Sequence, residues 1–439
     1  MTHQNLCLTC KELGKFDLVV VGGGCTGVFA AVRAARKGLK VAIVEKSGCF
    51  GGVATNGLIN IWHSLYDIYF KEQIIFGLTD EVEKTLLKGG YGRLQDKNES
   101  AGMIFDPNAL KWILDRLVSE SGVKIFFHTF YSSLILEDGG IKSVVVSNKD
   151  GLGIISGEFF IDATGDGDLC RDAGLEARVS DAIQPPSPAC FMSRRIKGDL
   201  ARLIGDHGAE FGLDDDWGWS CAVPGLEDTD LRVDFHIFGS NCANADRLSA
   251  AEVEGRRKMY AFLELLKKYD DPRHGIAAVC SQIGIRETNH YVTNFRATET
   301  DLLLGREYGD TVMKGTYRVD VHHSDGNGIS FKYLSGRTET FWGKGNKAVT
   351  GNWRREMNLT GDPAPYYSVP FGILVQNRVK NLIPVGRMIN ADPGAFGALR
   401  VMVNLNQLGE AAGVGAYLAV KEQKPVWDVC GKAVQKELQ

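Results

Sequence analysis

The N-terminal part of the chain alternates between apolar runs and glycine-containing turns. Residues 16–21, FDLVVV, have the apolar, β-branched character of a buried strand. A glycine turn, GGGCTG, follows, and then an alanine-rich stretch with helical spacing that ends at Gly38. A second apolar run at 41–46, VAIVEK, ends in charged residues. The pattern predicts a strand–helix–strand unit with two parallel strands.

Further elements follow from the same periodicities. Helical spacing and apolar alternation predict helices over 73–88 and 106–119, and strands over 123–129, 132–136, 141–147 and 159–163. Three prolines in residues 184–188 predict a rigid crossover. Beyond it we expect a helix over 249–269, capped by a Ser249–Glu252 capping box, a loop over 326–351, strands within 367–374 and 381–386, and a long helix over 398–420. The small residues of that last helix suit close packing on a sheet or a cofactor.

The glycines of the first turn have the spacing G-x-G-x-x-G. Gly22 permits a sharp turn, Gly24 lets the backbone approach a pyrophosphate, and Gly27 lets helix and strand pack closely. A helix that starts near Thr26 directs its amide groups toward the phosphates. Glu45, 21 residues after Gly24, can accept ribose hydroxyls. These residues predict a dinucleotide site and leave NAD and FAD open.

Composition narrows the class of protein. A chain of 439 residues predicts two or three domains. A net charge of −4 without a basic patch argues against nucleic acid. No apolar run is long enough to span a membrane, and the first residues lack a signal core, so we expect a cytoplasmic protein. Ten irregularly spaced cysteines fit a reducing compartment.

The close cysteine pair Cys7 and Cys10 precedes the first strand. It could be half of a metal or cluster site, or a redox pair. No second pair of this spacing completes such a site, so we interpret it as chance and expect no metal.

Six ordered blocks between about Phe16 and Val420 resemble a known family. They are VVVGGGCTGVFAAVRAARKG with VAIVEKSGCFGGVATNGLIN, FDPNALKWILDRLVSESGVKIFFHT, FIDATGDGDLCRDAG, AEVEGRRKMYAFL, IGIRET, and YSVPFGILVQNRVKNLIPVGRMINADPGAFGALRVM. These blocks resemble FAD-dependent oxidoreductases of glutathione-reductase-like fold. The resemblance extends at a distance to fumarate reductase flavoproteins and to the flavin module of heterodisulfide reductase.

The resemblance implies an α/β fold, in which a discontinuous Rossmann-like FAD-binding domain carries an inserted α+β cap. The FAD domain would comprise residues 14–180 and 367–425, the substrate cap 181–366, and the flexible or peripheral termini 1–13 and 426–439. The FAD contacts implied are Gly22, Gly24, Cys25, Thr26, Gly27, Glu45, Lys46, Gly51, Gly52, Val53, Ala163, Thr164, Gly165, Asp166, Gly386, Arg387, Ala398, Arg400, Val401 and Met402.

One departure from the family concerns the last block. Relatives commonly carry a histidine–glutamate pair just before its A-x-G segment, where this chain has Pro393 and Gly394. A role of that pair cannot be transferred to this protein.

Candidates for substrate chemistry lie mostly in the predicted cap. Arg286 and Arg400 could bind an anionic group, and Glu287 or His290 could act as a base. The alternative for Arg286 and Glu287 is a structural ion pair, and for Arg400 a domain-interface salt bridge. His63 could face the flavin or could simply pack in the core.

The leading hypothesis is an FAD-dependent oxidoreductase that acts on a small-molecule substrate by hydride transfer through flavin N5. The substrate is either an anion or a neutral metabolite. A second hypothesis is an electron-transfer subunit that serves partner proteins, and a third is a non-catalytic FAD binder. Either a homo-oligomer or an electron-transfer partner is compatible with the sequence. A pyridine-nucleotide disulfide reductase is disfavoured, because a C-x4-C pair and a second nucleotide motif are missing.

Overall fold

The structure is a computed structural model that describes residues 9–214, 220–226, 231–326, 328–342 and 348–438. Cys7 lies outside the described residues, and Cys10 is a free thiol.

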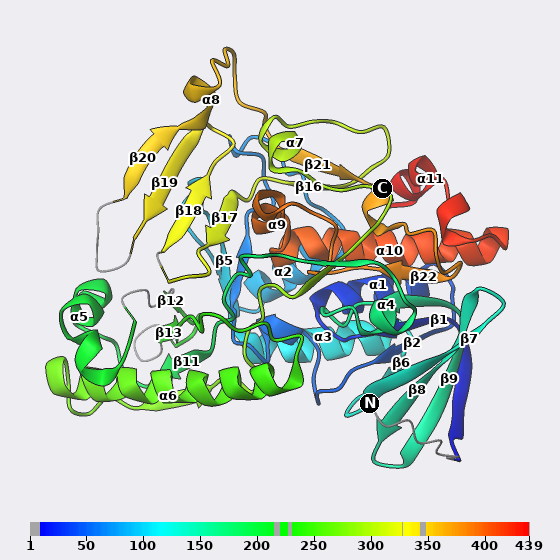
Figure 1. Ribbon diagram of the computed structural model, residues 1–439, viewed down its shortest axis with the longest axis horizontal. Helices are drawn as coiled ribbons and strands as arrows, with labels where there is room; N and C mark the ends of the chain where they lie inside the picture. The colour runs from blue at the N-terminus through cyan, green and yellow to red at the C-terminus, as the bar shows by residue number, and fades with distance from the viewer. Residues whose placement is uncertain (1–8, 215–219, 227–230, 327, 343–347, 439) are drawn as a thin grey trace.

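The predicted N-terminal strands form the centre of a seven-stranded sheet (Figure 1). Its parallel part has the order β6 (Lys124–Phe126), β2 (Val41–Val44), β1 (Lys11–Val21), β9 (Gly151–Asp162) and β22 (Leu382–Pro384). Residues 18–21 and 41–44 are all buried, which explains their uninterrupted apolar character, because both faces of this part of the sheet are covered. The strand β22 comes from far along the chain and pairs with the end of β9.

On the edge of β9 opposite β1, beside β22, the sheet continues into an antiparallel ribbon of β7 (Phe130–Glu137) and β8 (Gly140–Asn148). The two residues between these strands, Asp138 and Gly139, have φ of 49° and 75°. Positive φ at both positions is the requirement of a type I′ turn, which joins the two strands predicted over 132–136 and 141–147.

Two helices lie side by side against the parallel strands. They are α1 (Cys25–Arg36) and α10 (Met402–Glu422), the long orange helix of Figure 1. Gly409 and Gly413 of α10 contact the carbonyl groups of Thr26 and Ala30 of α1. The small residues of α10 therefore allow close packing, and the partner at Gly409 and Gly413 is a helix, whereas a sheet or the cofactor was expected. The contact positions advance together along both helices, so the two helices run parallel.

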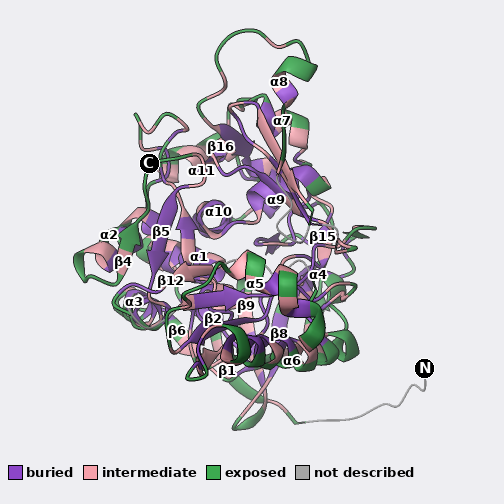
Figure 2. Ribbon diagram, turned by 90° about the vertical axis from the view of Figure 1, so that its left-hand side faces the viewer, coloured by how far each residue is buried: buried purple, intermediate pink, exposed green. Residues whose placement is uncertain are grey.

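The remaining elements form smaller sheets and the helices around them (Figures 1 and 2). One four-stranded sheet, ordered β12 (Ser220–Ala222), β13 (Leu231–Asp234), β11 (Ala189–Met192) and β14 (Ile276–Val279), packs on α5 (Leu200–His207) and α6 (Ala245–Tyr269). Another contains β17 (Val319–His322), β18 (Ile329–Lys332), β19 (Arg337–Phe341) and β20 (Val349–Asn352), with α9 (Pro393–Leu399) against β17.

Shorter elements complete the fold. The strands are β3 (Ile61–His63), β4 (Gly92–Leu94), β5 (Gly102–Phe105), β10 (Ala177–Val179), β15 (Asn289–Tyr291), β16 (Thr311–Gly315) and β21 (Tyr367–Pro370). The helices are α2 (Leu78–Lys88), α3 (Pro107–Glu120), α4 (Asp168–Asp172), α7 (Glu299–Leu303), α8 (Trp353–Glu356) and α11 (Gly431–Leu438), with short 3₁₀ turns at Gly52–Ala54, Gly208–Phe211, Phe371–Leu374 and Val426–Asp428. This architecture confirms the predicted α/β class.

Several predicted boundaries are wrong. The capping box at Ser249 does not form, because α6 begins earlier with Asn244 as its cap, and the Ser249 hydroxyl donates to the carbonyl of Ala245 inside the helix. The described residues of the predicted loop 326–351 are mostly strand, since they contribute β18, β19 and the first residues of β20. The predicted helix 73–88 starts only at Leu78.

The predicted helix 398–420 is two helices, because Arg400 and Val401 separate α9 from α10. The ends of the described chain also belong to the fold: β1 starts at Lys11, and α11 packs on α10 with Val434 buried. Among the described residues, no helix is both long enough and apolar enough to cross a membrane.

Candidate functional site

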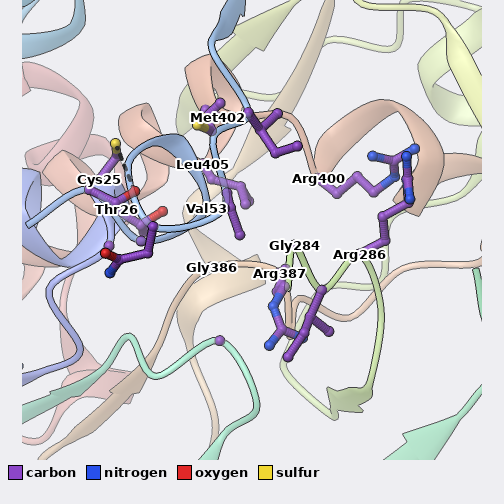
Figure 3. A pocket seen from close by; sticks show the side chains of 18 of the residues that line it. Cys25, Thr26, Val53, Gly284, Arg286, Gly386, Arg387, Arg400, Met402 and Leu405 are labelled. Carbon is purple, nitrogen blue, oxygen red and sulfur yellow. Dashed lines mark hydrogen bonds between the residues drawn. The ribbon is translucent and has the colours of Figure 1, made fainter. Parts of the chain in front are cut away.

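A cavity of about 700 Å³ opens at the carboxyl ends of β1, β2 and β9 (Figure 3). In an open α/β sheet this edge is where ligands bind. Of the residues that the resemblance implied for FAD, all except Gly27 and Ala398 line the cavity. Ala398 is buried behind it, and Gly27 packs against the carbonyl of Gly22, where a Cβ would lie 1.9 Å from the oxygen. Gly27 thus has the packing role that its motif position predicts.

The other two motif glycines differ in what surrounds them. Gly22 has φ of 107°, and a Cβ there would lie 2.2 Å from the carbonyl oxygen of Ala163 on the neighbouring strand. Gly24 lines the cavity with ordinary extended backbone, and a Cβ there would meet no atom within 4 Å. Gly22 is therefore required by the fold, whereas Gly24 keeps space open for a ligand.

The N-termini of α1 and α10 both open on this cavity. Neither helix has a side-chain cap or an acidic residue in its first turn, and the first amide groups of each are free of intrahelical partners. Met402 lies seven residues before Gly409, whereas Cys25 lies one residue before its contact partner Thr26. At 1.5 Å per residue, the N-terminus of α10 extends about 9 Å beyond that of α1, on the N-terminal side of the shared contact. The cavity thus has two separate regions that favour negative charge.

Glu45 lies at the rim, directly after β2. Its carboxylate accepts hydrogen bonds from the amides of Gly23 at 2.6 Å and Ser47 at 2.7 Å. Two amide donors fix the orientation of this carboxylate beside the glycine turn, as the position of a ribose-binding acid requires.

Arg387 joins the ends of β22 and β9 across the cavity floor. Its guanidinium lies 2.5 Å from a carboxylate oxygen of Asp166 and donates to the hydroxyl of Thr288 at 2.8 Å. Thr288 in turn donates to Asp166 at 2.9 Å. This network holds the segment at Gly386 next to the turn at Gly165 in a fixed geometry.

The sequence profile of the family described as "FAD dependent oxidoreductase" matches residues 17–438. The chain belongs to this family. Digeranylgeranylglycerophospholipid reductase 2 of Methanothermobacter thermautotrophicus is 28% identical over 176 residues, 37% of this chain and 43% of that protein. Dihydrolipoamide dehydrogenase of Chaetomium thermophilum is 30% identical over 124 residues, 22% of this chain and 24% of that protein. The chain spans less than half the length of these curated relatives.

Solved structures align over more of the chain at lower identity. A geranylgeranyl bacteriochlorophyll reductase-like protein from Thermoplasma acidophilum aligns over 96% of this chain and 82% of its own, with 12% identity and a TM-score of 0.49. Membership of the FAD-dependent oxidoreductase family makes FAD the cofactor.

The cavity fits that cofactor by its own chemistry. The open space at Gly24 and the uncapped α1 N-terminus would hold the pyrophosphate, and Glu45 the ribose. The uncapped N-terminus of α10, with Val401 and Met402 on the lining, would face the pyrimidine edge of the flavin. No acidic side chain caps either helix, so both anion-favouring positions remain open to the cofactor.

The end of the cavity away from Cys25 is cationic. Figure 3 shows Arg286 and Arg400 pointing toward this same end. Arg286 donates to the carbonyl of Pro185 at 2.7 Å and to the hydroxyl of Ser187 at 2.5 Å. Arg400 lies 3.3 Å from a carboxylate oxygen of Asp320. Both sequence-predicted anion binders are therefore on the cavity wall.

A third arginine, Arg318, was missed by the sequence analysis. It is 8% exposed, donates to the hydroxyl of Ser100 at 2.8 Å and stacks on aromatic rings, with Phe331 4.2 Å away. Within the described residues no carboxylate forms an ion pair with it. Burial disfavours the charge of this guanidinium, whereas the carboxylates of Asp320 and Glu339 favour it from a distance. A bound anion would add a direct partner of opposite charge.

The sequence did carry a signal for this group. Arg318, Asp320 and His322 alternate with valines at the start of and along β17, so they share one face of the strand. All three line the cavity, together with Tyr317, whose hydroxyl donates to Asp320, and His63 at the end of β3. Charged residues at every second position of an otherwise apolar strand were the pattern to look for.

Burial holds the pKa values of His63 and His322 well below the usual histidine range, and nearby arginines lower them further. For His63 these are Arg318 and Arg400, and for His322 Arg286 is the foremost. Both imidazoles are therefore neutral at pH 7.

Glu287 and His290 do not line the cavity, which corrects their expected place among the catalytic residues. His290 contacts Glu287 at 2.9 Å and the carbonyl of Ile389 at 2.8 Å, and Glu287 accepts from the amide of Gln184 at 2.9 Å. The buried pair ties the proline crossover to the segment before α9. Neighbouring side chains in an extended segment alternate in direction, so Arg286 faces the cavity and Glu287 faces away.

Gly394, which stands where the resembling family carries a polar residue, is closely packed in this structure. Asp392 caps α9 through the amide of Ala395, with Pro393 at the first helical position. A Cβ at Gly394 would lie 2.0 Å from a carboxylate oxygen of Glu299. The close approach of α7 to α9 leaves no room for a side chain at this position.

Proposed function

We propose that this protein is an FAD-dependent oxidoreductase whose substrate is a small carboxylate or similar anion. The observation that carries the proposal is Arg318, a buried guanidinium on the cavity wall without an ion-pair partner among the described residues. Arg286 and Arg400 add two more cationic groups at the same end. A carboxylate would gain charge-assisted hydrogen bonds there and would neutralise the buried charge.

FAD, when bound, supplies the two-electron hydride chemistry through its N5 position. The chain's own residues bind and orient the substrate. Arg318 and Arg400 hold the anion, and Asp320 positions Tyr317 and Arg400 through its contacts with both. The neutral His63 and His322 are available for proton transfer at pH 7.

The assignment of individual FAD contacts and the division into a discontinuous FAD domain with a cap at 181–366 are parts of this proposal. They are supported by the cavity lining and by the pairing of β22 with β9. A distant relationship to fumarate reductase flavoproteins and to the heterodisulfide reductase flavin module also remains a proposal. A cytoplasmic location is supported by the nine described cysteines, which are all free.

Thiol–disulfide chemistry receives no support from the geometry. Burial raises the pKa of Cys25 to about 12, and burial also raises the pKa of Cys49. A thiolate is the reactive form of cysteine, so neither thiol is activated at neutral pH. The proposal therefore concerns a substrate other than a disulfide.

The test begins with the visible spectrum of the purified protein, which we expect to show bound flavin. Under anaerobic conditions a panel of small metabolic acids is then added, and loss of the oxidised flavin band is followed. We expect bleaching by members of the acid panel and none by their amides. A protein that neither contains FAD nor takes it up, or one bleached equally by amides, would contradict the proposal.

A further inference from the structure

His63 ends β3 and faces the cationic end of the cavity. Its ring lies on that of Tyr317, with ring centroids 3.9 Å apart. Its Nδ1 atom is buried without a hydrogen-bond partner, and no hydrogen bond joins Nε2 to a described residue. A buried, unsatisfied imidazole on a cavity wall is a group that a ligand would satisfy.

The charges of two arginines on different elements act on this ring, and all three side chains line the same cavity. Arg318 precedes β17, and Arg400 lies at the break between α9 and α10. The Tyr317 hydroxyl next to the ring donates to Asp320, a carboxylate that also contacts Arg400. Asp320, an acid on the cavity side, is therefore already engaged.

The acids behind the ring are engaged as well. Asp67 and Glu99 share a small outer pocket with His63. The Asp67 carboxylate accepts from the amides of Tyr69 and Lys71 at 3.1 and 2.9 Å, and Glu99 pairs with Arg337 at 3.1 Å. No carboxylate among the described residues hydrogen-bonds the imidazole of His63, so the arginines dominate its electrostatic surroundings.

We propose that His63 takes up a proton when a small carboxylate binds to Arg318 and Arg400, so that ligand and proton enter the site together. This inference rests on the anionic substrate of the proposed function and adds a regulated proton to it. Before binding, the guanidinium groups of Arg318 and Arg400 disfavour a positive charge on His63. A bound carboxylate compensates the charges of the two arginines and gives the protonated imidazole of His63 a partner of opposite charge.

The neighbouring His322 does not share this arrangement. Its Nε2 atom lies 3.3 Å from a carboxylate oxygen of Asp320, and its ring packs edge-on against His236 with centroids 4.6 Å apart. An acid is thus present beside His322 whether or not a ligand is bound. His63, in contrast to His322, has no carboxylate partner among the described residues until a ligand supplies one.

The experiment uses the FAD-loaded protein in weakly buffered solution with a pH indicator. Acetate, malonate, succinate and benzoate are added between about pH 5.5 and about pH 8. Binding is measured independently through the perturbation of the flavin spectrum. We expect proton uptake that approaches about one proton per bound carboxylate at the acidic end and disappears toward pH 8.

Two histidine variants assign the proton. His63→Asn should bind the carboxylate and lose the uptake. The remote His207→Gln, on α5, should retain both. Uptake that persists in His63→Asn, or binding without uptake at every pH, would overturn the inference while leaving the anion site intact.

A second measurement guards against disturbance of the fold by the His63 substitution. In ligand-free Arg318→Met protein one of the two cations is gone, so the imidazole pKa of His63, followed by NMR of ¹⁵N-labelled histidine, should rise above that of the unmodified protein. An unchanged pKa would overturn the coupling. Failure of all four carboxylates to bind at any pH would overturn both the coupling and the anion site.

Discussion

Gly409 of α10 lies directly against Thr26 of α1, so that a Cβ at position 409 would be 2.3 Å from the Thr26 carbonyl oxygen. This contact sets the distance between two parallel helices whose N-termini open on one cavity. The relative position of the two helix N-termini, each of which favours a bound negative charge, therefore depends on the absence of a side chain at position 409.

Substitution Gly409→Val should separate the helices and lower the free energy of unfolding by about 3 kcal/mol. FAD content per chain, measured after release by denaturation, should fall with it. Lys421→Ala, at the exposed end of the same helix, is the control and should change neither quantity. A Gly409→Val protein with full FAD content would show that the helix spacing does not matter for the cofactor.

Gly24→Val should separate folding from cofactor binding. Gly24 has extended backbone and open space around it, so the variant should fold with nearly unchanged thermal stability. Its side chain would occupy the cavity and should weaken FAD binding by about 100-fold or more, a loss of about 3 kcal/mol.

The comparison for this variant is Gly22→Ala. Positive φ and the 2.2 Å approach to Ala163 predict destabilisation by about 3 kcal/mol even without cofactor. Equal stability of the two variants would contradict the different roles assigned to Gly22 and Gly24.

Glu83 on α2 offers a test through pH. Burial, and to a smaller extent Asp80, raises the pKa of Glu83 to about 7. The folded state then holds a proton that the unfolded state releases above its ordinary pKa, so this residue costs stability as the pH rises from about 4.5 to about 7. Glu83→Gln should therefore stabilise the protein by about 2 kcal/mol at pH 8 and by almost nothing at pH 4.

The matched control is Glu81→Gln, two residues away. Glu81 pairs with Arg36, and that hydrogen bond lowers the pKa of Glu81. Loss of this exposed pair should cost about 0.5 kcal/mol at pH 8. Thermal unfolding of the two variants across pH should show stabilisation by Glu83→Gln and destabilisation by Glu81→Gln at pH 8. A pH-independent effect of Glu83→Gln would refute the argument.

The cofactor end of the site was predictable because local sequence determines it. The glycine spacing at Gly22, Gly24 and Gly27 and the acid at Glu45 belong to one continuous strand–helix–strand unit. Their roles follow from backbone geometry that short-range patterns encode. The close packing of the small residues in α10 was predictable for the same reason, because it follows from a local sequence pattern.

The substrate end depends on which distant segments meet. The alternation at Arg318, Asp320 and His322 marks one face of β17, but it does not say what that face meets. The packing of α9 on β17 brings this face to the cavity wall that also carries Arg400. Glu287 was mistaken for a cavity residue because adjacency in sequence hides the alternation of directions in an extended segment. The break at Arg400–Val401 was missed, since both flanking segments have helical composition.

The central claim is that a buried arginine selects an anionic substrate for the flavin. The most direct measurement is anaerobic bleaching of the FAD-loaded protein by an acid identified in the panel, compared between the unmodified protein, Arg318→Lys and Arg318→Met. The account predicts that Arg318→Met raises the acid concentration needed for half-reduction by about 100-fold, while Arg318→Lys gives an intermediate value and FAD content stays unchanged. Equal bleaching by the unmodified protein and Arg318→Met would contradict it.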